Sequence, residues 1–257
     1  MKILLISGII LSTLFSGIIF FRKKDKSLSD KILGVWLIFL ALNYLRSYLI
    51  FEKEIMFLLG FGYTMPALDA PFFFLYILTL TTGQNKFKAR WLWHLTPFLL
   101  YNFYLFFFLY IKSPAERLAF FQDTTFFSRP LLFHFFEFIM VLIVPVYVAW
   151  SFIYIKNHLR NIRNRFSCKD KIDLNWVRYL LMSVSILWLM IIITKAVSGY
   201  YNTLRYNDTL MIIHYFELII VVVIGYFGFH QEKSLFSFSE VNVPDKNTKK
   251  YASTGLS

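Results

Sequence analysis

Long runs of apolar residues alternate with short polar segments along the whole chain. A helix needs about 20 mainly apolar residues to cross a bilayer, and seven stretches reach or approach that length. The predicted spans are roughly residues 3–21, 32–51, 65–82, 91–111, 130–155, 175–197 and 209–229. The pattern therefore predicts an all-α integral membrane protein, a seven-transmembrane helix bundle whose membrane domain covers residues 1–233.

The third span is the least regular of the seven. An apolar, glycine-containing stretch, residues 55–64, precedes it, and Pro66, Asp69 and Pro71 interrupt it. We expect a short re-entrant or interfacial piece there, leading into a helix that begins near Pro71, because proline suits a first helical turn. In the fifth span, Pro145 predicts a kink of the kind that membrane helices tolerate.

Composition agrees with a membrane location. Hydrophobic residues make up 58% of the 257 residues and charged residues only 16%, and 31 residues are Phe. A soluble domain of this length is nearer 45–50% apolar and about a quarter charged. The single cysteine, Cys168, excludes an intrachain disulfide framework.

The positive charges predict the orientation, because cytoplasmic loops carry an excess of Lys and Arg. With the N-terminus outside the cell, 19 of the 27 Lys and Arg residues fall on inner segments and six on outer segments. Arg22, Lys23 and Lys24 close the first span on its inner side. The C-terminus is then cytoplasmic, and residues 234–257, where hydrophobicity falls away, are predicted to form a cytoplasmic linker.

Ionisable side chains inside spans are costly and are candidates for function. They are Arg46, Asp69, His134, Glu137, Lys195, His214 and Glu217. Given the predicted orientation, all seven are expected in the outer third of the bilayer, within about two helical turns of its surface. His134 with Glu137, His214 with Glu217, and Asn43 with Arg46 are each three residues apart, and residues at that spacing share a helix face.

Two interpretations of this set stay open. The functional one is a polar pocket, open to the outside and formed by these seven residues and Asn43, which could hold a small polar or zwitterionic ligand. In the structural one, Arg46 and Lys195 pair with the acids as ties between helices, or extend to the lipid headgroups. No metal site is predicted, because neither a third nearby histidine nor a Cys ligand accompanies the two His-x-x-Glu pairs.

The loop between the fifth and sixth spans is strongly basic. Arg160, Arg163 and Arg165 extend the fifth helix past the membrane, either as positive charge facing lipid or as a coupling surface for a cytoplasmic domain. Gly225 and Gly228, near the end of the last span, are expected to act as a hinge. Trp36 lies near the inner end of the second span and is expected to be an interfacial anchor.

Motifs of enzymes are missing from the sequence. It contains no glycine-rich phosphate loop, no Gly-x-Ser-x-Gly and no Ser/His/Asp or Cys/His arrangement that suggests a nucleophile. We therefore expect neither catalysis nor a cofactor.

Several segments resemble the multi-pass N-terminal sensor region of bacterial membrane-bound transcription regulators of the AraC type. The segments are Ser27–Gly34, Ala70–Tyr76, His94–Phe98, Phe166–Ser167 with Lys171–Trp176, Gly225–Gly228 and Lys250–Ser257. They cover nearly the whole chain in order.

The resemblance implies one-component signalling in the bacterial inner membrane, in which an unknown small polar ligand repositions cytoplasmic helix-turn-helix domains. DNA would be bound only through a C-terminal domain not present in this chain, and the coding sequence is expected to continue past Ser257 into that domain. A homodimer is expected by analogy. The alternative is a small-solute or proton-coupled transporter, and an intramembrane metal hydrolase ranks third.

Overall fold

The chain is helical throughout the part that the structure describes. A computed structural model describes residues 1–22, 26–123, 129–165, 175–201 and 206–241, with only the backbone described for residues 22, 66, 159, 161–165, 175, 176, 195, 198–201, 206, 207 and 227–241. The elements are α1 (Lys2–Arg22), α2 (Leu28–Phe51), η1 (Met56–Leu58), α3 (Pro66–Thr82), η2 (Ala89–Leu95), α4 (Thr96–Leu105), η3 (Phe106–Tyr110), α5 (Pro114–Gln122), α6 (Leu131–Arg165), α7 (Asn175–Tyr201) and α8 (Tyr206–Val241). The described residues form no strand, which confirms the all-α class.

Each predicted span coincides with helical structure. Six described helices are long and apolar enough to cross a membrane, and the remaining predicted span is the shorter apolar helix Ala67–Thr82. The fourth span is built from a 3-10 segment, an α-helix and a π-helical turn in succession. The structure therefore supports a multi-pass membrane protein, whereas the count of seven crossings and their orientation stay predictions.

Two helix starts follow from local capping. At α2, the Ser27 hydroxyl accepts a hydrogen bond from the backbone N–H of Asp30, and the Asp30 side chain accepts one from the backbone of Ser27. Ser113 and Glu116 form the same capping box at α5, a short helix that hydropathy does not predict. Hydrogen bonds from Ser113 hold the pKa of the exposed Glu116 carboxyl below its usual value.

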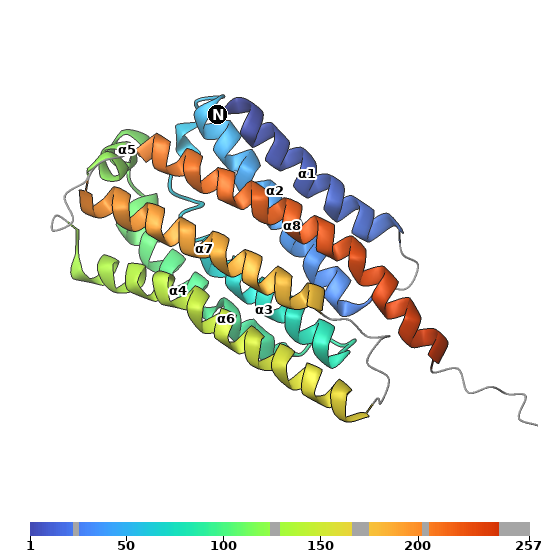
Figure 1. Cartoon of the computed structure of the whole chain (residues 1–257). Coiled ribbons are helices and arrows are strands. Elements are labelled where there is room, and N and C mark those ends of the chain that lie inside the picture. Colours follow the sequence, from blue (N-terminus) through green and yellow to red (C-terminus); the bar gives the residue numbers. More distant parts are fainter. Residues whose placement is uncertain (23–25, 124–128, 166–174, 202–205, 242–257) are drawn as a thin grey trace, which may run out of the picture.

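The helices contact one another in a closed circuit (Figure 1). Helix α1 packs against α2 and α8, α2 also contacts α3, α3 packs on α6, and α7 lies between α6 and α8. Contacts between α2 and α8 cross this circuit. Helix α4 contacts α3 and lies beside α6 at the edge of the bundle. The main apolar core is formed by α2, α3, α6, α7 and α8.

A second apolar core lies at the α5 end of the molecule. Its buried members are Ile50, Leu59, Tyr101, Leu105, Leu109, Phe121 and Phe133, from α2, α4, η3, α5, α6 and the segment around η1. Aromatic rings dominate it, for example Tyr101 stacked on Phe136 with ring centroids 4.7 Å apart. This core accounts for part of the unusual Phe and Tyr content of the chain.

The connection between α2 and α3 runs back into the bundle. Gly62 lies against the guanidinium of Arg46, and Asp69, in the first turn of α3, is hydrogen-bonded to Trp36. Trp36 precedes the end of α2 at Phe51 by fifteen residues, or about 22 Å along a helix. Helix α3 therefore begins beside the middle of α2.

The structure changes three expectations, which concern the start of α3, Asp69 and Trp36. Helix α3 begins at Pro66, with Pro71 inside the helix, so the predicted start near Pro71 is wrong. Asp69 lies deeper along α2 than the outer third in which the sequence placed it. Trp36 is 1% exposed in the core and hydrogen-bonded, and is therefore not an interfacial anchor. Helix α6 continues through Pro145.

Close packing of α1 depends on glycine. A Cβ atom on Gly8 would lie 2.5 Å from the ring of Tyr44 on α2, and one on Gly34 of α2 would lie 2.5 Å from the ring of Phe20 on α1. Gly225 of α8 has the same relation to Phe15 of α1, at 2.3 Å. Aromatic rings of neighbouring helices thus sit directly on the backbone at these glycines.

We expect Gly8→Ala to lower the free energy of unfolding by about 1–3 kcal/mol, because Tyr44 is buried and its rigid ring must shift to admit the methyl group. Gly17→Ala is the matched control on the same helix, since only Phe21 comes within 4.0 Å of its added Cβ. That change should be neutral or stabilising by up to about 1 kcal/mol. Unfolding of the purified chain in detergent, followed by tryptophan fluorescence, measures both. Equal effects of the two changes would contradict the packing.

Candidate functional site

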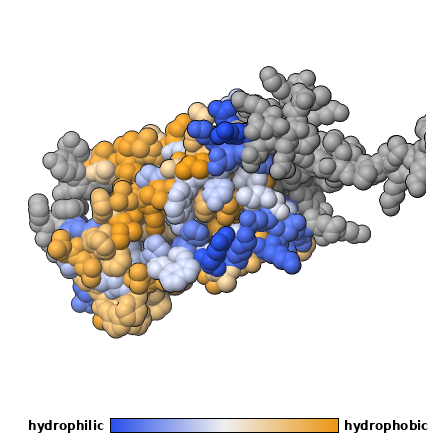
Figure 2. All heavy atoms as spheres, turned by 90° about the horizontal axis from the view of Figure 1, so that it is seen from below, coloured by the Kyte–Doolittle hydropathy of each residue, from blue (hydrophilic) through white to orange (hydrophobic). Residues whose placement is uncertain are grey.

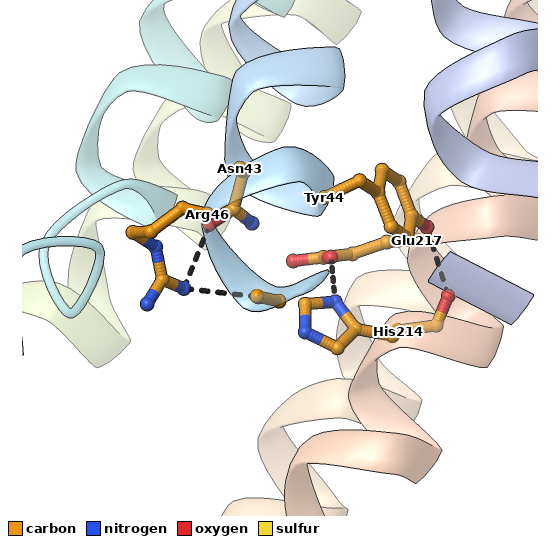
Figure 3. Close-up of polar contacts among 6 residues, drawn as sticks. Asn43, Tyr44, Arg46, His214 and Glu217 are labelled. Carbon is orange, nitrogen blue, oxygen red and sulfur yellow. Dashed lines mark hydrogen bonds and ion pairs between the residues drawn. The ribbon is translucent and has the colours of Figure 1, made fainter. Parts of the chain in front are cut away.

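The candidate site is a buried polar cluster that joins α2, α3 and α8. On α8, His214 Nδ1 lies 2.8 Å from Glu217 Oε2, and both side chains are buried (Figure 3). The spacing of three residues predicts that the two share a helix face, and the structure shows that they are hydrogen-bonded to each other. A pair of ionisable groups inside an apolar helix is costly, so its environment matters.

Tyr44 connects this pair to α2. Its hydroxyl donates a hydrogen bond of 2.9 Å to the backbone carbonyl of His214, and its ring centroid lies 5.3 Å from that of His214. On its other side the ring sits on Gly8 of α1. Tyr44 is fully buried, so this one side chain fixes α8 relative to both α1 and α2.

A second carboxyl group belongs to the same region. Asp69 of α3 accepts a 2.8 Å hydrogen bond from the indole nitrogen of Trp36. Asp69 and Tyr44 both interact electrostatically with Glu217. Two carboxyl groups and a histidine thus share a region of low dielectric, where each proton and each counter-charge has a large electrostatic effect.

Arg46 lies on α2 opposite the pair on α8 (Figure 3). Its Nη2 donates hydrogen bonds to Asn43 Oδ1 at 3.0 Å and Ser47 Oγ at 3.2 Å, which hold the guanidinium along α2. Gly62 covers the guanidinium so closely that an added Cβ would lie 2.1 Å from Nε. A larger residue at position 62 would therefore displace the guanidinium of Arg46 from this position.

The His214 ring has a polar atom that is left open. Within the part of the chain that the structure describes, Nε2 of His214 is buried and has no hydrogen-bond partner. Buried polar atoms normally have partners, so each exception calls for an explanation. The free ring nitrogen can accept or donate a hydrogen bond, depending on the tautomer.

The structure brings together only part of the predicted pocket. Asn43, Arg46, Asp69, His214 and Glu217 lie around the contact of α2 with α8 and α3.

Two other predicted residues lie elsewhere. Glu137 accepts a 2.9 Å hydrogen bond from the Tyr101 hydroxyl in the contact of α6 with α4, and the His134 ring lies against Phe133. The side chain of Lys195 is outside the described residues.

The predicted coupling residues are described only in part. Arg160 is exposed near the end of α6, whereas the side chains of Arg163 and Arg165 are outside the described residues. Gly225 lies inside the uninterrupted helix α8, where its backbone contacts Phe15, and Gly228 is described only as part of the helix backbone. Among the described side chains, no group of three or more His, Cys, Asp or Glu is placed to hold a metal ion.

Two residues that hold the site, and one structural residue outside it, have roles that the sequence pattern does not indicate. Trp36 and Tyr44 hold the site, but a Trp or Tyr inside an apolar span has no pattern that marks it as a hydrogen-bond donor. Arg117, on α5, is one of the six Lys and Arg residues assigned to outer segments, and its side chain is 2% exposed. The Ser113–Glu116 spacing is a capping signature, and it could have predicted α5 and so the helical context of Arg117.

Comparison with known proteins adds no information about this site. No protein family model, no curated protein and no solved structure matches the chain.

Proposed function

We propose that this chain is the membrane-embedded sensor module of a one-component transcription regulator. It detects a stimulus on the outer side of the membrane or within it and passes the change along α8 to a cytoplasmic helix-turn-helix domain. In this proposal the N-terminus is outside, the C-terminus is cytoplasmic and the membrane is the bacterial inner membrane. The excess of Lys and Arg on the proposed inner segments and the resemblance to AraC-type sensor regions support it.

The observation that carries the proposal is the continuity of α8. The apolar stretch of this helix is Asp208–Tyr226, and the helix continues to Val241, fifteen residues or about 22 Å further. The His214–Glu217 pair and its bond to Tyr44 lie near the other end of the same helix. A change at the polar cluster can therefore reach the end of α8 as a movement of one rigid element.

The stimulus is proposed to act by a difference in binding to two positions of α8, since a ligand shifts an equilibrium only through such a difference. Tyr44 holds α8 in the position described here. A small polar ligand that bound the open Nε2 of His214 would shift this equilibrium if its contact formed in only one of the two positions. The basic end of α6, with Arg160 exposed, would lie on the same cytoplasmic side as the moving end of α8.

The proposal predicts that Tyr44→Phe moves the far end of α8. Spin labels at Lys156→Cys and Lys233→Cys, in a Cys168→Ser background, report the distance between α6 and α8 in lipid nanodiscs. Without the Tyr44 hydroxyl, the distance distribution should broaden and shift on the order of 2 Å.

Tyr147→Phe is the matched control for this experiment. It also removes one tyrosine hydrogen bond, the 2.7 Å contact with His94, and the ring of Tyr147 packs on Phe74, His94 and Trp150 of α3, η2 and α6. Unchanged distances in Tyr44→Phe, or equal changes in both variants, would remove the support for α8 as the transmitting element.

A transporter is the second candidate, because two carboxyl groups and a histidine are buried together beside the middle of α2. Such a set can exchange protons within a membrane. A proton flux into liposomes containing the purified chain, abolished by Glu217→Gln, would replace the sensor proposal. With the sensor function we expect no flux above that of empty liposomes.

A further inference from the structure

An apolar groove runs along the edge of the bundle between α4 with η3 and the beginning of α6. It encloses about 820 Å³, and its lining includes Trp93, Leu100, Phe103 and Phe107 on one side and Phe135 and Ile139 on the other. Leu100, Phe103 and Phe135 are each more than half exposed. The groove thus opens to the surroundings of the bundle.

The dimensions of the groove suit a hydrocarbon chain. Trp93 and Phe107 are fourteen residues apart, about 21 Å along a helix, whereas one leaflet of the hydrocarbon core is about 15 Å thick. Figure 2 looks onto the side of the bundle on which α6 lies, and hydrophobic residues gather on the left part of that face, whereas hydrophilic residues gather toward the right. An acyl chain of a neighbouring lipid can therefore enter the groove from the side. There it supplies van der Waals contacts to both helices where they do not contact each other.

Positive charge gathers at one end of this groove. The Lys112 ammonium lies 5.0 Å from the ring centroid of Phe108, which lines the groove. The Arg129 guanidinium lies over Phe120 and Phe133, at 4.7 and 5.1 Å, and both of these rings contact Phe108. Two cations thus stand at the α5 end of an apolar groove.

The acid nearest in sequence to Lys112 is Glu116, which interacts with it electrostatically and offsets part of the charge of the two cations. The Glu116 carboxylate accepts hydrogen bonds from the backbone N–H and the hydroxyl of Ser113, at 2.8 and 2.7 Å, and so belongs to the capping box of α5. Anionic lipid headgroups are attracted to Lys and Arg at the membrane surface. The apolar groove therefore matches the acyl chain of an anionic lipid, and the two cations at its end match the headgroup.

We propose that this groove binds one anionic membrane lipid, with an acyl chain between α4 and α6 and the phosphate beside Lys112 and Arg129. The site is separate from the polar cluster of α2, α3 and α8 and does not depend on the sensor function. It would make the contact between α4 and α6 sensitive to the lipid composition of the membrane.

Native mass spectrometry of the detergent-solubilised chain tests this proposal. The chain is titrated with phosphatidylglycerol or with phosphatidylcholine of the same acyl chains. The first phosphatidylglycerol should bind several-fold more tightly than the first phosphatidylcholine. Lys112→Gln should weaken phosphatidylglycerol binding about fivefold and leave phosphatidylcholine binding unchanged, since one surface cation contributes on that order. Lys53→Gln, an exposed cation on the turn after α2, is the control and should change neither.

A second pair of variants tests the groove itself. Leu100→Trp fills the groove and should weaken binding of both lipids, whereas Leu99→Trp changes an equally exposed neighbour outside the lining and should weaken neither. Thermal unfolding confirms that each variant is folded. Equal affinity for the two lipids, equal effects of the two tryptophan variants, or a dimer that forms through this face and excludes lipid would each overturn the proposal.

Discussion

Arg117→Ala is expected to destabilise the α5 end of the molecule more than any other change to a charged residue outside the membrane-length helices. Arg117 lies on α5 and is 2% exposed. Its guanidinium donates to the backbone carbonyls of Lys112, Phe57 and Leu59, at 3.0, 2.7 and 3.3 Å, and also to that of Tyr110. The same group lies over the rings of Phe57 and Phe61.

These contacts explain the size of the expected effect. Arg117 connects three segments that hydropathy treats as separate: the segment around η1, the end of η3 and α5. Alanine leaves four carbonyls without a charged donor, and each buried acceptor without a partner costs about 1–3 kcal/mol. Allowing for partial relaxation, the free energy of unfolding should fall by about 3–5 kcal/mol.

Thermal unfolding in detergent, read by tryptophan fluorescence, measures this change. Arg117→Lys should recover only part of the loss, because one ammonium cannot reproduce the planar set of donors. Arg129→Ala is the control, since Arg129 is half-buried and donates to two carbonyls at 3.1 and 3.5 Å. Its cost should stay near 1 kcal/mol. A loss for Arg117→Ala no larger than that for Arg129→Ala would show that the buried contacts do not hold this end together.

The positions of the helices could be predicted from the sequence because an apolar run of sufficient length has one stable form in a bilayer. How deep each helix begins in the bundle could not be predicted in this way. Hydropathy records that residues 55–64 are apolar, but an apolar segment can either leave the bundle or turn back into it. The contact of Asp69 with Trp36 shows that it turns back, so Asp69 lies beside the middle of α2.

The contact between His214 and Glu217 could be inferred from their spacing in the sequence. His214 and Glu217 are three residues apart on one helix, and local geometry is enough to place them together. The same spacing at His134 and Glu137 does not lead to the same site, because α6 faces α4 there and Glu137 binds Tyr101. Periodicity assigns a helix face but not the neighbour that this face meets.

The remaining part depends on tertiary contacts that leave no local signal. Tyr44 is one of 16 tyrosines in the chain, and nothing near it in sequence indicates that its hydroxyl reaches a carbonyl 170 residues away. Gly8 and Gly62 become informative only once Tyr44 and Arg46 are seen lying on them. The residues that orient the site are therefore visible only in the assembled bundle.

His214→Leu should be the most destabilising change within the polar cluster itself. It leaves the Glu217 carboxylate, 7% exposed, beside Asp69 without its hydrogen-bonded partner, and breaking a buried ionic pair on one side costs about 3–5 kcal/mol. Glu217→Leu should cost less, about 1–3 kcal/mol, because it leaves one buried histidine nitrogen without its hydrogen-bond partner.

The double variant with leucine at both positions decides why the pair is present. Replacing both partners of a buried pair by apolar residues is often neutral or stabilising. We therefore expect His214→Leu with Glu217→Leu to recover most of the unfolding temperature lost in His214→Leu, in a double-mutant cycle read by tryptophan fluorescence. A pair that apolar residues can replace without loss of stability is retained for what it binds or transmits, and the spin-label distances between α6 and α8 should still differ from wild type in that variant. If the double variant is as unstable as the sum of the single ones, each side chain stabilises the bundle through contacts other than the one between them. Both residues are then structural, and the open nitrogen of His214 loses its significance as a ligand contact.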